Sequence, residues 1–345
     1  MSFVSLSFPS LPAPMVTVLH KLLPSLPPTG RDVDVPPVYR EPFVLSGYRP
    51  VGLSWRCCVL SLFQRHNDVV KVWCPLLAAV AVATRFLFFT VLQAGGVLGV
   101  RLQSPEGSGV SLDPSSLPLL LYVSSVVFGL CCSAASVLLR PRSRPVRSSL
   151  LLLDAVGRGV HQASRALALS VYSSDSDWTQ SAAGQLYLPT AALLAWSSCI
   201  SGCCVELYLQ RSKLVHRRLL QGGPVLLGFL LDISPVVKRL HTWSSSPAVV
   251  LFLLAAVFLF CPVPECLSPG HFDILGHSLQ LFQVLQTLST LCQQEALLQD
   301  FSWRRAGLTR TFGEERLLGA SAGLTVFALS CSATAVALRR CSGTR

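Results

Sequence analysis

Residues 72–92 read VWCPLLAAVAVATRFLFFTVL, a stretch in which Arg85 is the only charged side chain. A helix that crosses the hydrocarbon core of a bilayer needs about 20 mostly apolar residues, so this stretch predicts a transmembrane helix. Seven later segments have the same character and lie at residues 117–139, 150–172, 186–207, 224–237, 248–260, 276–298 and 317–338. We therefore predict an all-α, multi-pass transmembrane helix bundle with seven core spans and an eighth C-terminal span.

The composition favours the same class. The chain has 345 residues, of which 51% are hydrophobic and 13% are charged, whereas a soluble domain carries about 25% charged residues. The net charge of +11 would suggest nucleic-acid binding in a soluble protein. Here the basic residues lie in short loops between apolar runs, which indicates membrane topology. We expect no nucleic-acid partner, and the cysteines lack zinc-finger or disulfide-framework spacing.

The basic loops predict the orientation of the chain. Lys and Arg gather in the N-terminal region, in the 140–147 and 211–218 loops and at the C-terminus. If the spans alternate, these regions share one side, which the positive-inside rule makes cytoplasmic. The last loop contradicts the rule, because it contains Arg304, Arg305, Arg310 and Arg316. Either one span is misplaced or this loop is an exception.

The segment ahead of the first span is polar and bracketed by prolines. Residues 40–50 read REPFVLSGYRP, too short for a domain and too specific for a linker. The first 35 residues are rich in Ser and Pro and lack the basic start of a signal peptide. The predicted divisions are a flexible cytoplasmic tail at residues 1–35, a membrane-proximal motif segment at 36–71, the bundle at 72–338 and a cytoplasmic tail at 339–345.

Several separated motifs occur in an order that identifies a family. They read PPVYREP at residues 36–42, GYRP at 47–50, SLFQ at 61–64, LDISPVV at 231–237, CPVPE at 261–265 and QEA at 294–296. With these motifs the chain resembles the progestin and adipoQ receptor family, and within it the membrane progestin receptors, from about residue 33 to the C-terminus. The resemblance implies a bundle of seven spans, with an eighth in this subgroup, and a multi-pass receptor of the plasma membrane.

The chain departs from this family at its metal site. The family is similar to ceramidase-related hydrolases, and the resemblance implies a zinc ion held by three imidazoles, one from span two and two from span seven. The corresponding motifs here read Cys132-x-x-x-Ser136 and Leu279-x-x-x-Gln283, so all three imidazoles are missing. We expect no metal and no other cofactor. A replacement set of Cys132, Asp154 and His277 stays open, but it would need a different geometry.

Two further family positions bear on the site. The family's Glu-x-x-Asn-x-x-Thr-His element reads Asp68-x-x-Lys71-x-x-Cys74-Pro75. The aspartate of span three is kept as Asp154. Arg158 follows four residues later, on the same helix face, and a charge inside a membrane is costly unless it is paired or faces a cavity.

Arg158 has two interpretations: it supplies the positive charge of the lost metal, or it only neutralises Asp154. The candidate ligand-binding residues at the former metal site are Asp154, Arg158, Ser136, Leu279 and Gln283. We expect them to line one cavity in the cytoplasmic half of the bundle. Arg165 is expected to extend towards the membrane interface.

Three functional hypotheses follow. The first is a non-catalytic membrane steroid (progestin) receptor, surrounded by membrane lipids, that holds its ligand in the bundle and signals to an intracellular partner such as a G protein. The steroid and the G protein come only from the resemblance. The second is a zinc-dependent lipid amide hydrolase, against which the missing histidines argue. The third is a degenerate family member without a ligand.

Overall fold

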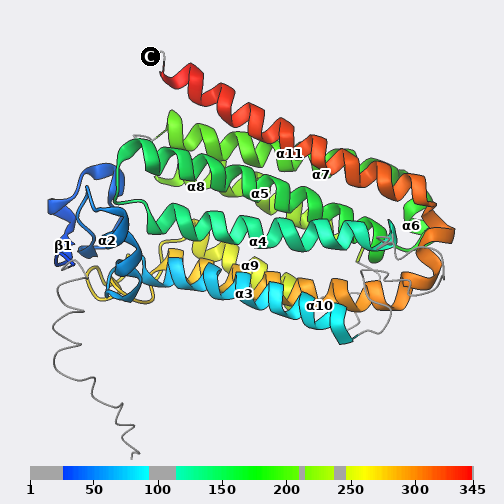
Figure 1. The fold of residues 1–345 in the computed structure, drawn as a ribbon. Helices are drawn as coiled ribbons and strands as arrows, with labels where there is room; N and C mark the ends of the chain where they lie inside the picture. The colour runs from blue at the N-terminus through cyan, green and yellow to red at the C-terminus, as the bar shows by residue number, and fades with distance from the viewer. Residues whose placement is uncertain (1–25, 93–113, 210–213, 237–245, 344–345) are drawn as a thin grey trace, which may run out of the picture.

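The computed structural model describes residues 26–92, 114–209, 214–236 and 246–343. Its described part contains eight long helices that run alternately up and down one bundle (Figure 1). These helices are α3 (Val69–Leu92), α4 (Leu117–Leu138), α5 (Arg144–Tyr172), α7 (Ala182–Leu207), α8 (Leu214–Ile233), α9 (Ser246–Phe260), α10 (Ser278–Phe312) and α11 (Glu314–Gly343). The short elements η4 (Pro114–Ser116) and α6 (Ser176–Gln180) precede α4 and α7. The prediction of an all-α bundle is confirmed.

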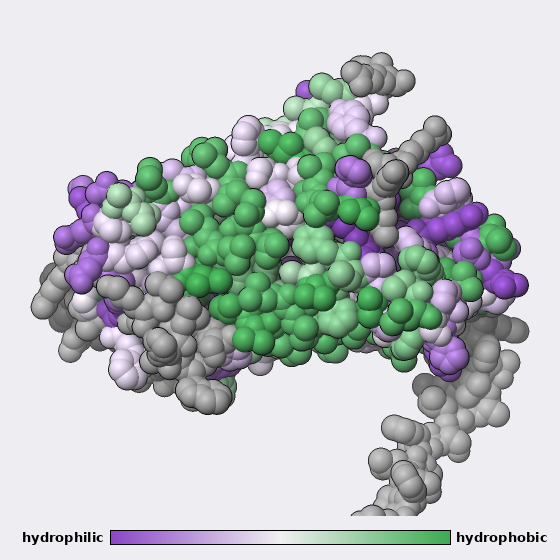
Figure 2. All heavy atoms as spheres, turned by 180° about the vertical axis from the view of Figure 1, so that it is seen from behind, coloured by the Kyte–Doolittle hydropathy of each residue, from purple (hydrophilic) through white to green (hydrophobic). Residues whose placement is uncertain are grey.

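The outer surface of the bundle is apolar. Leu77, Leu87, Leu193 and Val326 are all more than half exposed, and Figure 2 shows hydrophobic residues across the middle of one face with hydrophilic residues towards both ends. A surface of this kind is stable in lipid rather than in water. By length and hydropathy α3, α4, α7 and α11 are each able to cross a membrane, and α9 is a shorter apolar helix. The protein is an all-α membrane bundle.

Helix α8 begins well before its predicted span, residues 224–237. It begins at Leu214 rather than at residue 224, and Pro224 lies inside it. The polar side chains between Leu214 and Pro224 hid the start of the helix from a hydropathy criterion. The helix ends at Ile233. Pro235 accounts for this end, because a proline disfavours helical geometry at the residue before it, which is Ser234. Residue 237 lies outside the described residues.

Helix α10 contains much of the segment that was predicted as the last loop. It has 35 residues, about 50 Å at 1.5 Å per residue, whereas the hydrocarbon core is about 30 Å thick. Arg304 and Arg305 therefore belong to the far end of this helix rather than to a loop. Gly313, with φ +73°, then turns the chain directly into α11. These arginines still lie at the end of the bundle opposite the predicted cytoplasmic loops, so they remain an exception to the positive-inside rule.

One end of the bundle is covered by a small structure that we call the cap, residues 30–64 (Figure 1). It contains β1 (Gly30–Arg31), η1 (Asp32–Asp34), η2 (Pro37–Tyr39), β2 (Ser46–Tyr48), α2 (Trp55–Leu60) and η3 (Ser61–Phe63), and β1 pairs antiparallel with β2. The core of the cap is small and consists of Val35, Tyr39, Val44 and Tyr48. Asp273 attaches the cap to the segment before α10, since it accepts hydrogen bonds from Leu45 N at 3.0 Å and Ser46 Oγ at 2.6 Å.

The backbone conformation and the close packing at Gly47 of the GYRP motif require a glycine at this position. Its φ is +82°, and a Cβ there would lie 3.2 Å from the backbone nitrogen of Asn67. The same nitrogen donates to the carbonyl of Gly47 at 3.0 Å. The motif thus makes a close contact between the cap and the start of α3.

The described elements extend into both predicted tails. Residues 1–25 lie outside the described part, but residues 30–35 belong to the cap, where Val35 is buried. At the other end α11 continues to Gly343, inside the predicted tail at 339–345, and residues 344–345 lie outside the described part. Hydropathy locates the membrane-crossing part of a helix and not its polar ends.

Candidate functional site in the helix bundle

Helix α5 carries a row of polar side chains on one face. Asp154, Arg158, His161, Gln162 and Arg165 follow one another at spacings of four, three, one and three residues. This spacing places them along one face of a helix. Asp154, Gln162 and Arg165 are buried, and Arg158 and His161 are half-buried. Polar groups in a membrane helix face the interior or a cavity because lipid cannot solvate them.

Arg158 and Asp154 form the expected ion pair. Arg158 Nη1 donates a hydrogen bond to Asp154 Oδ2. Asp154 is 5% exposed, and its Oδ1 has no hydrogen-bond partner in the described part of the chain. The guanidinium also lies close to α7, where a Cβ on Gly202 would come within 3.0 Å of Nη2. A glycine at position 202 therefore leaves room for this arginine.

A second ion pair follows along the same face of α5. Arg165 Nε donates to Asp232 Oδ2 on α8 at 2.7 Å, and Tyr187 OH on α7 donates to Asp232 Oδ1 at 2.6 Å. The expectation that Arg165 extends to the interface is wrong, because this residue is 5% exposed and paired inside the bundle. The sequence held no signal for this pair, since its partners lie on helices whose packing it does not specify.

Three cavities meet around Arg158. A polar chamber of about 70 Å³ lies between α4, α5 and α10. A lateral cavity of about 190 Å³ lies between α8, α9 and α10, and a connecting cavity of about 40 Å³ lies between α5, α8, α9 and α10. Arg158 and Gln286 line all three cavities. These two side chains therefore stand at the junction of the internal space.

The predicted site residues divide between these cavities. Asp154, Arg158 and Gln283 line the polar chamber. Leu279 lines the lateral cavity instead. Ser136 is buried, lies in the lining of none of these three cavities, and donates to the carbonyl of Ser133 at 2.8 Å.

Five further polar residues line the polar chamber, and the sequence analysis assigned none of them to the ligand site: Ser133, His161, Gln286, Thr287 and Thr290. A signal for two of them was present on α10. Gln286 and Thr290 follow Gln283 at spacings of three and four residues, which places all three on one helix face. His161 has the same relation to Arg158 on α5.

The residues at the former metal positions do not fit a zinc site. Zinc requires imidazole, thiolate or carboxylate ligands that converge in a tetrahedron. Ser136, Leu279 and Gln283 offer no such group, and no cluster of three His, Cys, Asp or Glu side chains with metal-binding geometry occurs among the described residues. His277 is directed elsewhere, since its Nε2 lies 3.2 Å from the carbonyl oxygen of Asn67. The alternative set of Cys132, Asp154 and His277 is therefore not assembled.

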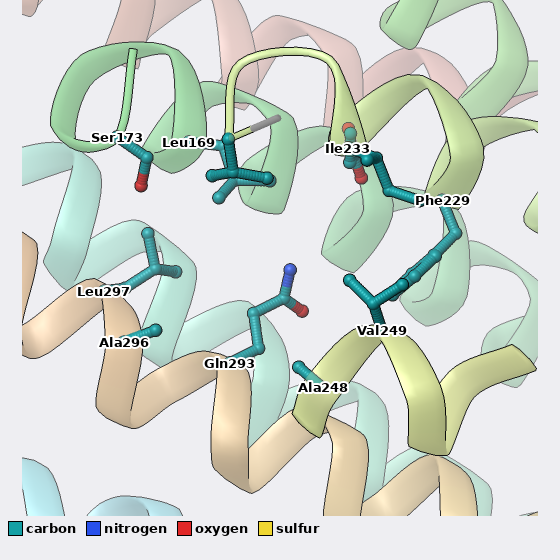
Figure 3. A pocket seen from close by; sticks show the side chains of 11 residues that line it. Leu169, Ser173, Phe229, Ile233, Ala248, Val249, Gln293, Ala296 and Leu297 are labelled. Carbon is teal, nitrogen blue, oxygen red and sulfur yellow. The ribbon is translucent and has the colours of Figure 1, made fainter. Parts of the chain in front are cut away.

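A fourth cavity, of about 30 Å³, lies further from the cap (Figure 3). Figure 3 shows the amide of Gln293 directed into it from α10, opposite Leu169 and Ser173 of α5. Its other strongly polar groups are already engaged: Asp232 with Arg165 and Tyr187, and Ser173 with Asp300 Oδ2 at 2.6 Å. This cavity offers less volume and fewer unused polar groups than the space around Arg158.

A different arrangement of charges lies where the cap meets the bundle. Lys71 Nζ is 2.5 Å from Glu41 Oε1 and 2.5 Å from Asp68 Oδ1. Arg49 Nη2 is 3.3 Å from Asp68 Oδ2, and Arg140 Nη1 is 3.4 Å from Glu41 Oε1. Burial acts to raise the pKa of Asp68, but Lys71, Arg140 and Arg49 outweigh it and hold this pKa well below its usual range. We call these five residues the cap cluster.

Histidines lie on two sides of the cap cluster. His277 Nδ1 is 3.9 Å from Glu41 Oε2, and burial, with Lys71, lowers the pKa of His277. His66 Nδ1 accepts a hydrogen bond from the backbone N–H of Asp68 at 3.0 Å, and Nε2 lies 3.1 Å from the carbonyl oxygen of Ser61. Burial, with Arg49, lowers the pKa of His66 to about 4. Both pKa shifts favour the uncharged form of the imidazole.

The fold and site define a class. A multi-pass membrane protein with a site inside its helix bundle has three features that occur here: an apolar outer surface, a polar interior face, which lies on α5, and internal cavities beside an ion pair. The chain matches the model of the haemolysin-III-related family over residues 63–294 and belongs to this family, which is the progestin and adipoQ receptor family.

Several characterised relatives carry receptor names. The chain is 37% identical to membrane progestin receptor beta of Mus musculus over 93% of its own length and 90% of the relative. It is 38% identical to the human beta receptor, over 94% of the chain and 90% of the relative. Membrane progestin receptor alpha of Cynoscion nebulosus is 37% identical, over 92% and 88%. The match therefore covers nearly the whole of each protein.

Proposed function

We propose that this chain is a non-catalytic membrane progestin receptor of the plasma membrane that holds a steroid within its helix bundle. Two findings support this: relatives that match most of the chain are named membrane progestin receptors, and cavities surround a polar junction inside the bundle. Ligand pockets are typically apolar with a few polar groups that fix orientation. The observation that carries the proposal is that Ser136, Leu279 and Gln283 stand at the positions of the metal ligands, with Gln283 lining the same cavity as the Asp154–Arg158 pair.

The proposed orientation places the cap in the cytoplasm, where an intracellular partner such as a G protein would read the state of the bundle. The basic residues of the predicted cytoplasmic regions support this orientation. Arg140 follows the end of α4 and Arg147 lies in the first turn of α5, both beside the cap, whereas Arg211 and Lys213 lie outside the described residues. Epitope tags at residue 2 and after Arg345 test it, and surface staining of intact cells at either tag contradicts it.

The central test is ligand binding with metal analysis on the same sample. Membranes that express the chain should bind labelled progestin saturably, and the purified protein should contain no stoichiometric zinc and show no ceramidase activity. One zinc ion per chain that survives chelator treatment, together with hydrolysis of a lipid amide, would contradict the non-catalytic role. Absence of saturable progestin binding would contradict the receptor role.

A further inference from the structure

Arg158 has hydrogen-bond donors that the protein itself does not use. A guanidinium carries five N–H donors in a fixed plane. Among the described residues, Asp154 accepts from Nη1, and neither Nε nor the other Nη has a hydrogen-bond partner. The side chain is 33% exposed, and it lines all three cavities around it. The unused donors are therefore available at the junction of the internal space.

The charges around Arg158 select the kind of group that can pair with it. Asp154 neutralises Arg158, and Asp232 neutralises Arg165 one step further along α5. The site thus has strong donors but no net positive charge to attract an anion into a membrane interior. Gln286, whose side-chain amide has no partner among the described residues, adds a further donor at the same junction. A neutral acceptor such as a carbonyl oxygen suits these groups best.

The lateral cavity provides the complementary apolar surface. Its wall next to Arg158 and Gln286 is formed by aliphatic and aromatic side chains of three helices: Val225, Leu226, Phe252, Leu259, Leu279 and Phe282. No charged side chain other than Arg158 lines this cavity. A ligand there would have its polar end at Arg158 and its apolar body between α8, α9 and α10.

We infer that Arg158, with Gln286 beside it, is the specificity-determining residue of the site and recognises a carbonyl oxygen at one end of a neutral, apolar ligand. The inference rests on the proposed function, since a progestin that carries ketones is such a molecule. Sites for ligands of this size occupy about 300–1,000 Å³, more than the lateral cavity's 190 Å³. The ligand therefore extends from the lateral cavity into the spaces beside it, where Arg158 and Gln286 line all three cavities.

The test compares ligands and variants together. Progesterone has a ketone at each end, and two analogues each lack one of them. In the unmodified protein one analogue should bind about 10- to 100-fold more weakly than progesterone, as expected for a lost hydrogen bond to a charged group. In Arg158→Met the same analogue and progesterone should bind with equal affinity. If Arg158→Met does not fold, the variant Arg158→Met with Asp154→Asn, which also removes the opposing charge, replaces it.

The control is Arg147→Met on the same helix. Arg147 Nη1 donates to Glu206 Oε1 at 2.7 Å and lines none of the cavities around Arg158. Its loss should lower the amount of folded protein but keep the ratio between progesterone and the weaker analogue. An unchanged ratio in the Arg158 variants, or equal binding of all three ligands by the unmodified protein, would overturn the inference. No progesterone binding at all would instead overturn the proposed function.

Discussion

The cap cluster and the Asp154–Arg158 pair are both arrangements of charges inside the protein. They differ in whether hydrogen-bond donors remain that face a cavity. In the cap cluster each charged side chain has an oppositely charged neighbour, and Lys71 contacts two carboxylates at once. In the bundle, Arg158 has one carboxylate, and the rest of its guanidinium faces cavities. We interpret the first arrangement as holding the cap on the bundle, and in the proposed site the second offers donors to a ligand.

The largest effect should come from removing the cation at the centre of the cap cluster. The substitution Lys71→Met leaves Glu41 and Asp68 without their shared partner, while all three side chains are at most 10% exposed. Removal of one member of a buried ion pair costs about 3–5 kcal/mol. We expect this loss as a lower thermal midpoint in detergent and a smaller monodisperse fraction.

A matched control lies at the opposite end of the bundle. Arg304 Nη2 is 3.1 Å from Asp175 Oδ1, and the two side chains are 25% and 37% exposed. Pairs of this exposure contribute about 0.2–1 kcal/mol, so Arg304→Met should change the midpoint little. A Lys71→Met variant as stable as Arg304→Met would show that the cap cluster does not hold the cap.

Acidification should weaken the cap end next. The pKa of His66 is lowered to about 4 in the folded protein, whereas a free histidine titrates near 6.5. Below pH 6.5 the unfolded chain takes up a proton that the folded chain does not, so stability falls as the pH falls towards 4. At about 1.4 kcal/mol per pH unit, the loss between pH 6.5 and 5 is about 2 kcal/mol.

Thermal midpoints measured between pH 7 and 5 check this prediction. His277 acts in the same direction, because its pKa is also lowered. The variant His66→Gln should therefore reduce the pH dependence without abolishing it. The carboxylates of the cap cluster have lowered pKa values and lose their contribution only at lower pH. A midpoint that is constant from pH 7 to 5 would contradict the buried, uncharged state of His66.

The two regions also differ in how far the sequence predicted them. Period and spacing along one helix were enough to pair Asp154 with Arg158, because four residues separate them. The eight helices were predicted from apolar runs, and the largest boundary errors, at the end of α10 and the start of α8, arose where polar residues extend a helix. The cap cluster joins Glu41, Asp68 and Arg140 across distant segments. No local pattern specifies such contacts, and the same holds for Arg165 with Asp232.

The motif residues illustrate the same limit at a finer scale. Lys71 was noted as a departure from the family's element, but the sequence did not reveal that it lies between Glu41 and Asp68. Ser136 and Leu279 were expected beside Gln283 because of their positions in the family's metal motifs. Whether a side chain reaches a shared cavity depends on helix rotation and packing, which motif spacing does not determine.

A smaller loss of stability than in the two preceding predictions should come from the pair inside the bundle, and it separates the two interpretations of Arg158. Asp154→Ala leaves the arginine without its carboxylate, but contact with the cavities reduces the cost to about 1–2 kcal/mol, less than for a fully buried pair. Expression and progestin binding should both fall. The double variant Asp154→Ala with Arg158→Val removes both charges and should restore expression, because no uncompensated charge remains.

The binding affinity of this double variant separates the two interpretations. If Arg158 only neutralises Asp154, the double variant recovers binding as well. If Arg158 recognises the ligand, binding stays weak in a well-expressed protein. Saturation binding normalised to the amount of folded receptor distinguishes these results, and normal expression with normal binding in the single Asp154→Ala variant would contradict both interpretations.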